Sequence, residues 1–169
     1  MTAEAKTILA IDPGFDRCGA AIIHTGAPSK VFHSWCIQTD KKDSHADRLA
    51  LIFKNIEHAI AEYAPDAIAL ETLFFSVNKK TVMAVAEARG VIVVLAGLHR
   101  IPLIELSPQA VKLAMTGSGN ADKISVQKMV ALTMKIDISK KIDDEIDAIA
   151  LGMAAAGTLR LQQFQQFQQ

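Results

Sequence analysis

Carboxylates close two of the apolar runs in this sequence. Asp12 follows the run at residues 8–11, and Glu71 follows the run at residues 67–70. Functional groups collect at the ends of strands in open α/β sheets, so neighbouring strands would place both acids at one rim. Asp12 precedes a Pro-Gly pair, which is also ordinary turn chemistry. Taken alone, Asp12 therefore leaves turn residue and metal ligand as equal alternatives.

The acids at the start of the last predicted helix are the sharper signal. Asp144 and Asp147 lie three residues apart and share one helix face. Residues 148–157, which follow, carry no polar side chain, and this indicates a buried helix. Burying a carboxylate is costly unless a partner compensates its charge, and a metal ion could be that partner. For Asp143 and Glu145, the preferred interpretation is simpler, because acids in a first turn favour the helix dipole.

Together, Asp12, Glu71, Asp144 and Asp147 form a candidate metal site. Four carboxylates without a cluster of His or Cys suit a hard cation such as Mg²⁺ or Mn²⁺. Two such ions about 4 Å apart can activate water and stabilise the leaving oxygen in phosphodiester cleavage. The sequence contains no Walker-type phosphate loop, dinucleotide fingerprint or nucleophile elbow. Asp16 is interpreted as a surface acid outside this site.

The composition is that of one globular domain. Half of the 169 residues are hydrophobic, 21% are charged and the formal net charge is zero, which argues against a disordered chain. No apolar run approaches the ~20 residues of a membrane span, and the N-terminus lacks a signal-peptide pattern. We therefore expect a cytoplasmic protein that does not enter a membrane. Cys18 and Cys36 make no disulfide framework and are expected to be buried thiols.

Charge is distributed unevenly along the chain. Residues 76–135 contain eight Lys or Arg and three Asp or Glu, whereas acids are in excess on both sides of this segment. A basic segment between acidic ones fits a site that holds metal ions beside a phosphate backbone. A chance solvated face explains the same pattern equally well.

The pattern of apolar residues and turn signals predicts a mixed α/β sheet. Strands are expected at residues 7–12, 19–25, 30–39, 66–71 and 101–106, and helices at 45–63, 78–98, 107–116, 122–134 and from 143 to at least 156. The first three strands, joined by short links, predict an antiparallel meander. The helix at 78–98 is expected to be interrupted or kinked near Gly90. The domain is expected to span residues 1–157, and the Gln-rich tail at 158–169 either extends the last helix or frays, fraying being favoured.

Five motifs follow one another along the chain: Ile11–Gly14, Glu71–Phe75 with Asn78, Glu87–Gly90, Ser107–Val130 and Asp143–Ala154. In this order and at these separations they resemble those of the RuvC Holliday-junction resolvases, which are bacterial endonucleases. The resemblance covers about residues 8–157 and implies an RNase H-like mixed five-stranded sheet flanked by helices. The chain departs from the family at Cys18-Gly19-Ala20, where members usually carry Thr, Gly and an aromatic residue.

The resemblance also implies roles for single residues. Asp12, Glu71, Asp144 and Asp147 match the catalytic carboxylates that hold two Mg²⁺ ions, for which Mn²⁺ can substitute. Lys112 and Lys123 match basic residues near the scissile phosphate. Asp143 is one position away from the match, but its i, i+4 spacing to Asp147 keeps it as an alternative. The expected DNA contacts are Phe74 (which would stack on an unpaired base, with Phe75 as the fallback), Asn78, Arg89, Lys112, Gly117, Gly119 and Lys123.

By the same resemblance, the protein is a homodimer that cuts symmetrically opposed strands of a four-way DNA junction in recombination and repair, leaving 5′-phosphates and 3′-hydroxyls. The long helix at 78–98 is the expected dimer surface, and the RuvA and RuvB branch-migration proteins are expected partners. Two other interpretations stay open, a related nuclease acting on pre-ribosomal RNA and a non-catalytic junction-binding scaffold. The block from Lys112 to Lys123 argues against the first, and the retention of four acids argues against the second. Zero net charge indicates modest, salt-sensitive DNA affinity.

Overall fold

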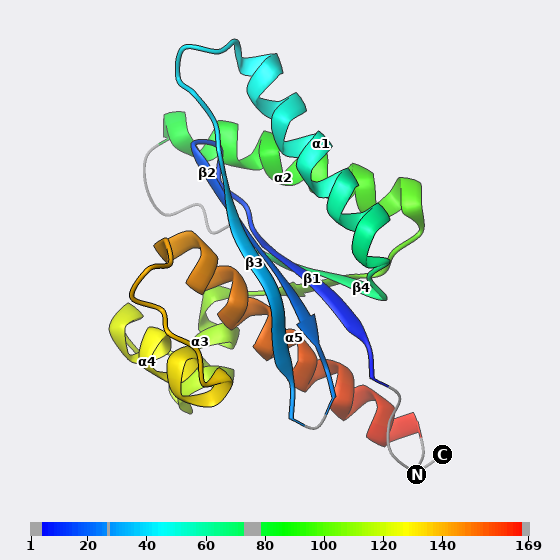
Figure 1. The fold of residues 1–169 in the computed structure, drawn as a ribbon, viewed down its shortest axis with the longest axis vertical. Helices are drawn as coiled ribbons and strands as arrows, with labels where there is room; N and C mark the ends of the chain where they lie inside the picture. Colours follow the sequence, from blue (N-terminus) through cyan, green and yellow to red (C-terminus); the bar gives the residue numbers. More distant parts are fainter. Residues whose placement is uncertain (1–4, 27, 73–78, 167–169) are drawn as a thin grey trace.

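The fold is a five-stranded sheet with helices on both faces (Figure 1). It is a computed structural model and describes residues 5–26, 28–72 and 79–166. Within these residues the elements are, in chain order, β1 (Thr7–Asp12), β2 (Arg17–His24), β3 (Lys30–Gln38), α1 (His45–Tyr63), β4 (Ala67–Glu71), α2 (Lys79–His99), β5 (Leu103–Leu106), α3 (Pro108–Thr116), α4 (Lys123–Met134) and α5 (Asp143–Gln166).

The sheet is mixed, with strand order β3-β2-β1-β4-β5. The first three strands pair antiparallel, which confirms the predicted meander. The two later strands pair parallel, β4 with β1 and β5 with β4. The predicted fold class, a mixed five-stranded sheet with flanking helices, is therefore confirmed.

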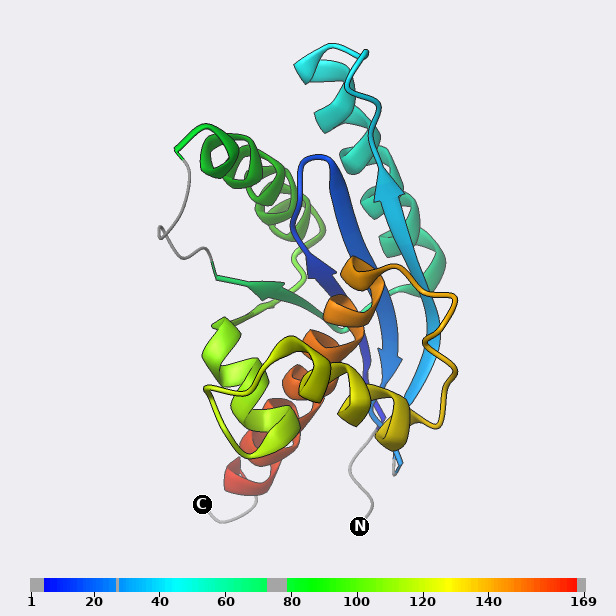
Figure 2. The same cartoon turned by 90° about the vertical axis from the view of Figure 1, so that its left-hand side faces the viewer.

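Alternation along the central strands separates two hydrophobic cores. In β1, Leu9 and Ile11 face the core formed with α1 and α2, whereas Ile8 and Ala10 face the core formed with α3, α4 and α5. Figure 2, at right angles to Figure 1, shows the resulting layers, with α1 and α2 on one side of the sheet and α3 to α5 on the other. Side chains at even positions of β1 therefore face α5.

Small residues let α5 approach the middle of the sheet closely. Ala10, Ala21 and Gly19 lie on the sheet face that α5 covers. A Cβ at Gly19 would lie 1.9 Å from the carbonyl oxygen of Asp144, and a Cβ at Gly152 would lie 2.5 Å from Cγ1 of Ile23. Side chains at these two glycines would thus push the helix away from the strands.

Local capping explains why most helices begin and end where predicted. Ser44 and Ser107 cap α1 and α3 by accepting hydrogen bonds from backbone amides three residues later, and Gly117 ends α3 in the left-handed conformation, with φ of 79°. The predicted helix at 78–98 is observed as α2, but it is uninterrupted through Gly90. Helix α5 continues to Gln166, so the Gln-rich stretch extends the helix that far rather than fraying from residue 158.

Helix α2 carries an apolar face that the rest of the described chain leaves uncovered. Ile92 and Leu95 are fully buried against the sheet, whereas Met83, Val94 and Leu98 are each more than half exposed. The segment Val82–His99 is long and apolar enough to span a membrane by length and composition alone, which is weak support for a span because core helices pass the same test. The exposed residues fall on one stripe of the helix, as at a surface made to be covered.

Paired glycine substitutions in α5 test its close packing. We expect Gly152→Ala to lower the free energy of unfolding by about 1–3 kcal/mol, because the new methyl group overlaps Ile23 and Ala10. Gly157→Ala, in the same helix but with open space around the new Cβ, should raise it by about 0.5–1 kcal/mol through helix propensity. Urea denaturation measures both, and equal effects of the two substitutions would contradict close packing at Gly152.

Candidate active site

Strand register brings Asp12 and Glu71 together. Strands β1 and β4 run parallel with Ile11 opposite Leu70. The next residues, Asp12 and Glu71, end the two strands and therefore lie side by side. Ala10 and Ala69 face α5, and alternation places Asp12 and Glu71 on that same face. Pro13 and Gly14 end the strand directly after Asp12. Both acids therefore lie at one end of the sheet, beneath α5.

The first turns of α5 bring two more acids to this end. Asp12 pairs across the strands with Gly19, and the backbone of Asp144 packs on that glycine, so Asp144 lies beside Asp12. Asp147 is one turn further along α5 and faces the same region. The start of α5 is fixed on β3 by Ser34, whose hydroxyl donates to Glu145 at 2.9 Å.

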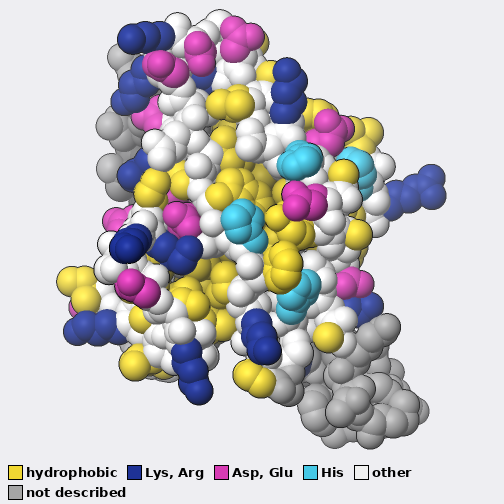
Figure 3. All heavy atoms as spheres, in the orientation of Figure 1, with side chains coloured by type: hydrophobic (Ala, Val, Ile, Leu, Met, Phe, Trp, Pro, Cys, Tyr) yellow, Lys and Arg dark blue, Asp and Glu magenta, His cyan; other side chains and the backbone are white. Residues whose placement is uncertain are grey.

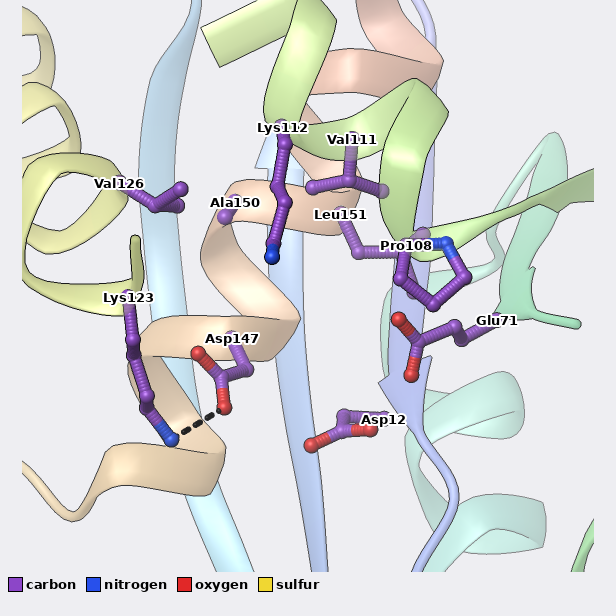
Figure 4. Close-up of a pocket in the computed structure, with 10 residues that line it drawn as sticks. All are labelled: Asp12, Glu71, Pro108, Val111, Lys112, Lys123, Val126, Asp147, Ala150 and Leu151. Atoms are coloured by element: carbon purple, nitrogen blue, oxygen red, sulfur yellow. Dashed lines mark hydrogen bonds and ion pairs between the residues drawn. The ribbon is translucent and has the colours of Figure 1, made fainter. Parts of the chain in front are cut away.

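Asp12, Glu71 and Asp147 line a cavity of about 280 Å³ together with two lysines, Lys112 from α3 and Lys123 from α4. Figure 4 shows the three carboxylates pointing into the cavity and the lysine side chains reaching toward them. Apolar side chains complete the wall: Pro108, Val111, Val126, Ala150 and Leu151. The cavity therefore combines acids, two cations and a partly apolar lining.

Lys123 is held by the acids of α5. It follows the α4 N-cap residue Asp122, and its Nζ donates to Oδ2 of Asp147 at 2.8 Å and lies 3.5 Å from Oδ2 of Asp143. Burial lowers the pKa of Lys123, but the two carboxylates outweigh it and the net pKa is raised. Lys123 is therefore a charged group paired with Asp147. In Figure 3, Lys and Arg side chains lie beside acidic ones over the region of α3, α4 and the start of α5.

The carboxylates of the site are crowded and partly buried. Burial, followed by the charges of Glu71, Asp147 and Asp144, raises the pKa of Asp12 from 3.8 to about 8. The pKa of Glu71 is also raised, by burial and by Asp147, against a hydrogen bond with Asp12 and the charge of Lys112. Burial raises the pKa of Asp147, against its pairing with Lys123. These acids share a need for positive charge that the lysines meet only in part.

Asp144 is turned to the other side, toward β2. Its Oδ2 lies 3.1 Å from Nε of Arg17 but makes no hydrogen bond, and it is the buried side-chain oxygen left without such a partner in the described part of the chain. The 3.1 Å ion pair and the unmet hydrogen bond are compatible, because the approach of Arg17 lacks hydrogen-bond direction.

The donor set suits a hard cation, although the side chains are not gathered around one. Among the described residues, no three His, Cys, Asp or Glu side chains lie close enough to hold one metal ion as they stand. Two of the acids pair with basic side chains instead, Asp147 with Lys123 and Asp144 with Arg17. The all-oxygen chemistry, the raised pKa of Asp12 and the unpartnered oxygen of Asp144 nevertheless fit Mg²⁺ or Mn²⁺. To bind such an ion, Asp144 and Asp147 would have to leave their basic partners.

The remaining predicted residues have other positions. The side chain of Arg89 donates to the carbonyl of Glu71 at 3.3 Å and forms an ion pair with Glu105, so it supports the end of β4. Gly117 and Gly119 lie in the loop between α3 and α4, outside the residues that line the cavity. Asp143 faces α4, where Gln127 donates to it at 3.3 Å. Phe74, Phe75 and Asn78 lie outside the described residues.

Contacts from α1 support the turn after Asp12, and they were not predicted from the sequence. The buried guanidinium of Arg48 lies 3.8 Å from the ring centroid of Phe15 and forms an ion pair with Asp16. His45 stacks on Phe15 and contacts Glu87 of α2 at 2.6 Å. Asp16 is exposed, as expected from the sequence, and it also anchors Arg48; hydrogen bonds with Arg48 and Lys41 lower its pKa. The spacing of Asp16 and Arg48 in sequence gives no signal of this contact.

Comparison with known proteins gives one consistent result. The family described as "Crossover junction endodeoxyribonuclease RuvC" matches residues 8–155. Crossover junction endodeoxyribonuclease RuvC of Brachyspira hyodysenteriae is 41% identical over 90% of this chain and 95% of its own, and that of Alkaliphilus metalliredigens is 39% identical over 88% and 92%. The solved structure of T. thermophilus RuvC in complex with Holliday junction substrate superposes with a TM-score of 0.86 at 25% identity, covering 92% of this chain and 96% of that one.

The raised pKa of Asp12 predicts a pH-dependent stability. Between about pH 4 and pH 8 the folded protein keeps a proton that the unfolded chain has released, so stability falls as pH rises, by at most about 1.4 kcal/mol per pH unit. Asp12→Asn removes this contribution. In metal-free buffer we expect Asp12→Asn to exceed the wild type in stability at pH 8, with a difference that shrinks toward pH 5.

Urea denaturation at several pH values in the presence of a chelator measures this effect. Glu57→Gln, which removes an exposed acid of α1, should give a stability profile parallel to that of the wild type. A parallel profile for Asp12→Asn as well would mean that Asp12 is ionised at its ordinary pKa.

Proposed function

The chain belongs to the family of RuvC crossover junction endodeoxyribonucleases, and we propose that it resolves four-way DNA junctions at the cavity between β1, β4 and α5. The observation that carries this proposal is the convergence of Asp12, Glu71 and Asp147, with Asp144 adjacent, at the sheet end beside two lysines. Crowded carboxylates facing an open cavity suit hydrolysis of a phosphodiester by cation-assisted attack of water. The T. thermophilus relative, solved with a Holliday junction, supports the choice of substrate.

We propose that the site holds two Mg²⁺ ions, for which Mn²⁺ can substitute. Their ligands would be four carboxylates: Asp12, Glu71, Asp144 and Asp147. When bound, these ions would activate the attacking water and stabilise the leaving 3′ oxygen. Burial is the largest cause of the raised pKa of Asp12, and a bound cation would offset the second cause, which is the charge of the surrounding acids. The products would be a 5′-phosphate and a 3′-hydroxyl.

The lysines would position the phosphate. Lys112 reaches into the cavity, and no carboxylate of the described residues lies at hydrogen-bond distance from it, so its ammonium group is available for a phosphate oxygen. Lys123 would do the same once Asp147 turns to the cation. We propose Gly117, Gly119 and Arg89 as further contributors near the DNA, with Phe74, Phe75 and Asn78 contacting the crossover itself. The role of Arg89 would be indirect, through the backbone of Glu71.

Two sites are needed to cut opposed strands, and we propose a homodimer formed through α2. Met83, Val94 and Leu98 give that helix an exposed apolar stripe on the layer that also supports the turn after Asp12. A contact there would couple the two active sites through α1 and α2. We also propose a cytoplasmic location, where the DNA substrate lies, and RuvA and RuvB as partners in branch migration.

Junction cleavage by Asp12→Asn tests the proposed chemistry. We expect cleavage of a labelled four-way junction in Mg²⁺ to fall at least a hundredfold, because a cation ligand is lost, while junction affinity in a gel-shift assay changes less than about threefold. Glu57→Gln should match the wild type in both assays. Equal loss of binding and cleavage in Asp12→Asn would instead indicate a folding role.

Cleavage assays on a four-way junction, matched duplex and single-stranded DNA, and structured RNA separate the resolvase from the two alternative functions. Symmetric nicks in the junction, with matched duplex and single strands intact, support a resolvase. Preferential cleavage of structured RNA would support the ribosomal-RNA nuclease. Tight junction binding without nicks in either Mg²⁺ or Mn²⁺ would support the scaffold.

The dimer surface is tested by a charge in the apolar stripe. Leu98→Glu should shift the protein toward monomer in sedimentation analysis, because burying a lone carboxylate is unfavourable. Leu132→Glu alters a similarly exposed leucine on α4 and should leave the oligomeric state unchanged. A dimer that survives Leu98→Glu would place the interface elsewhere.

A further inference from the structure

Besides Lys112 and Lys123, the site has a third basic residue, Arg17, which contacts one of its acids. It begins β2, two residues before Gly19, so alternation points its side chain to the same face as Gly19 and toward α5. Its Nε lies 3.1 Å from Oδ2 of Asp144. About half of the Arg17 side chain is exposed, at 53%, whereas that of Asp144 is only 19% exposed. The pair therefore joins a half-exposed cation to a largely buried acid.

Asp144 cannot leave this position by moving its backbone. Its carbonyl group packs on Gly19 with no space for a side chain between them, and the next residue, Glu145, is tied to Ser34 and Lys141. Only the carboxylate can change partner, by rotation about its side-chain bonds. What Asp144 binds is therefore decided by competition between Arg17 and whatever lies in the cavity.

The fit between Arg17 and Asp144 is weak. The ion pair lacks a directed hydrogen bond, and Oδ2 of Asp144 is left without one. A hollow of about 510 Å³ lies on this side of Asp144, lined in part by Phe15, Ala84 and Arg17 itself, which gives the guanidinium room to move away. A contact of this kind balances the charge of the acid in the metal-free protein and yields to a stronger partner.

We propose that Arg17 competes with the metal ion for Asp144 and thereby lowers the affinity of the site for its cation. This inference rests on the proposed function, because it requires a cation at the carboxylates. Arg17 is a positioning residue that acts through Asp144. It repeats on the β2 side what Lys123 does for Asp147 on the α4 side.

Titration calorimetry with Mg²⁺ on the full-length, DNA-free protein tests the competition. Because Arg17 is half exposed, we expect Arg17→Gln to bind Mg²⁺ about two- to five-fold more tightly than the wild type. Arg17→Lys, which keeps a cation there, should return the affinity toward the wild-type value. The matched control is Lys41→Gln, which removes an exposed cation near the same turn that pairs with Asp16, and its Mg²⁺ affinity should be unchanged.

Each result of the titration has one meaning. Unchanged or weaker Mg²⁺ binding by Arg17→Gln overturns the proposal, as does an equal gain in Lys41→Gln, which would reflect net charge. Mg²⁺ binding that Asp12→Asn leaves unaffected would count against the proposed metal site itself, and so against both proposals. Thermal unfolding without metal checks that each variant is folded, and Arg17→Met provides a second neutral variant should Arg17→Gln not fold.

Discussion

The contact between α5 and the centre of the sheet is the constraint on which the other features depend. Ala10, Gly19 and Gly152 remove side-chain volume where the helix crosses the strands, so its axis lies close to β1 and β2. The same approach that buries Ile149 and Leu151 carries the start of the helix over the ends of β1 and β4. Apolar packing along most of α5 thus determines where its acidic first turns must lie.

The position of those acids is electrostatically unfavourable without a further cation. Asp12 is surrounded by Glu71, Asp147 and Asp144, and the combined effect of burial and these charges appears in its raised pKa. Hydrophobic contacts elsewhere in α5 offset the cost, because a folded protein tolerates local strain when the surrounding packing over-determines the position. A site held together in this way gains most from binding positive charge, whether a metal ion or a lysine.

Much of this arrangement could be predicted from the sequence. The meander, the capping of α3 by Ser107 and Pro108, and the apolar stretch after Asp147 are local signals, and each corresponds to an observed element. The strand order and the ion pairs could not be predicted, because they join residues far apart in the chain. Arg17 with Asp144, and Arg48 with Asp16, carry no periodicity or spacing that would mark them. The break expected at Gly90 did not occur because glycine is tolerated inside a helix whose neighbours pack well.

Asp144 and Asp147 of α5 each pair with a basic side chain, so the crowding of acids at this end of the sheet is relieved in more than one way. Repulsion between neighbouring carboxylates can be relieved by protonation, as the raised pKa of Asp12 indicates. It can also be relieved by an ion pair with a basic side chain, as for Asp147 and Asp144. A protonated acid must lose a proton before it can bind a metal ion, whereas an acid in an ion pair must change its partner. Lys123 and Arg17 therefore balance the charge of Asp147 and Asp144, and they are also the side chains that a cation would have to displace.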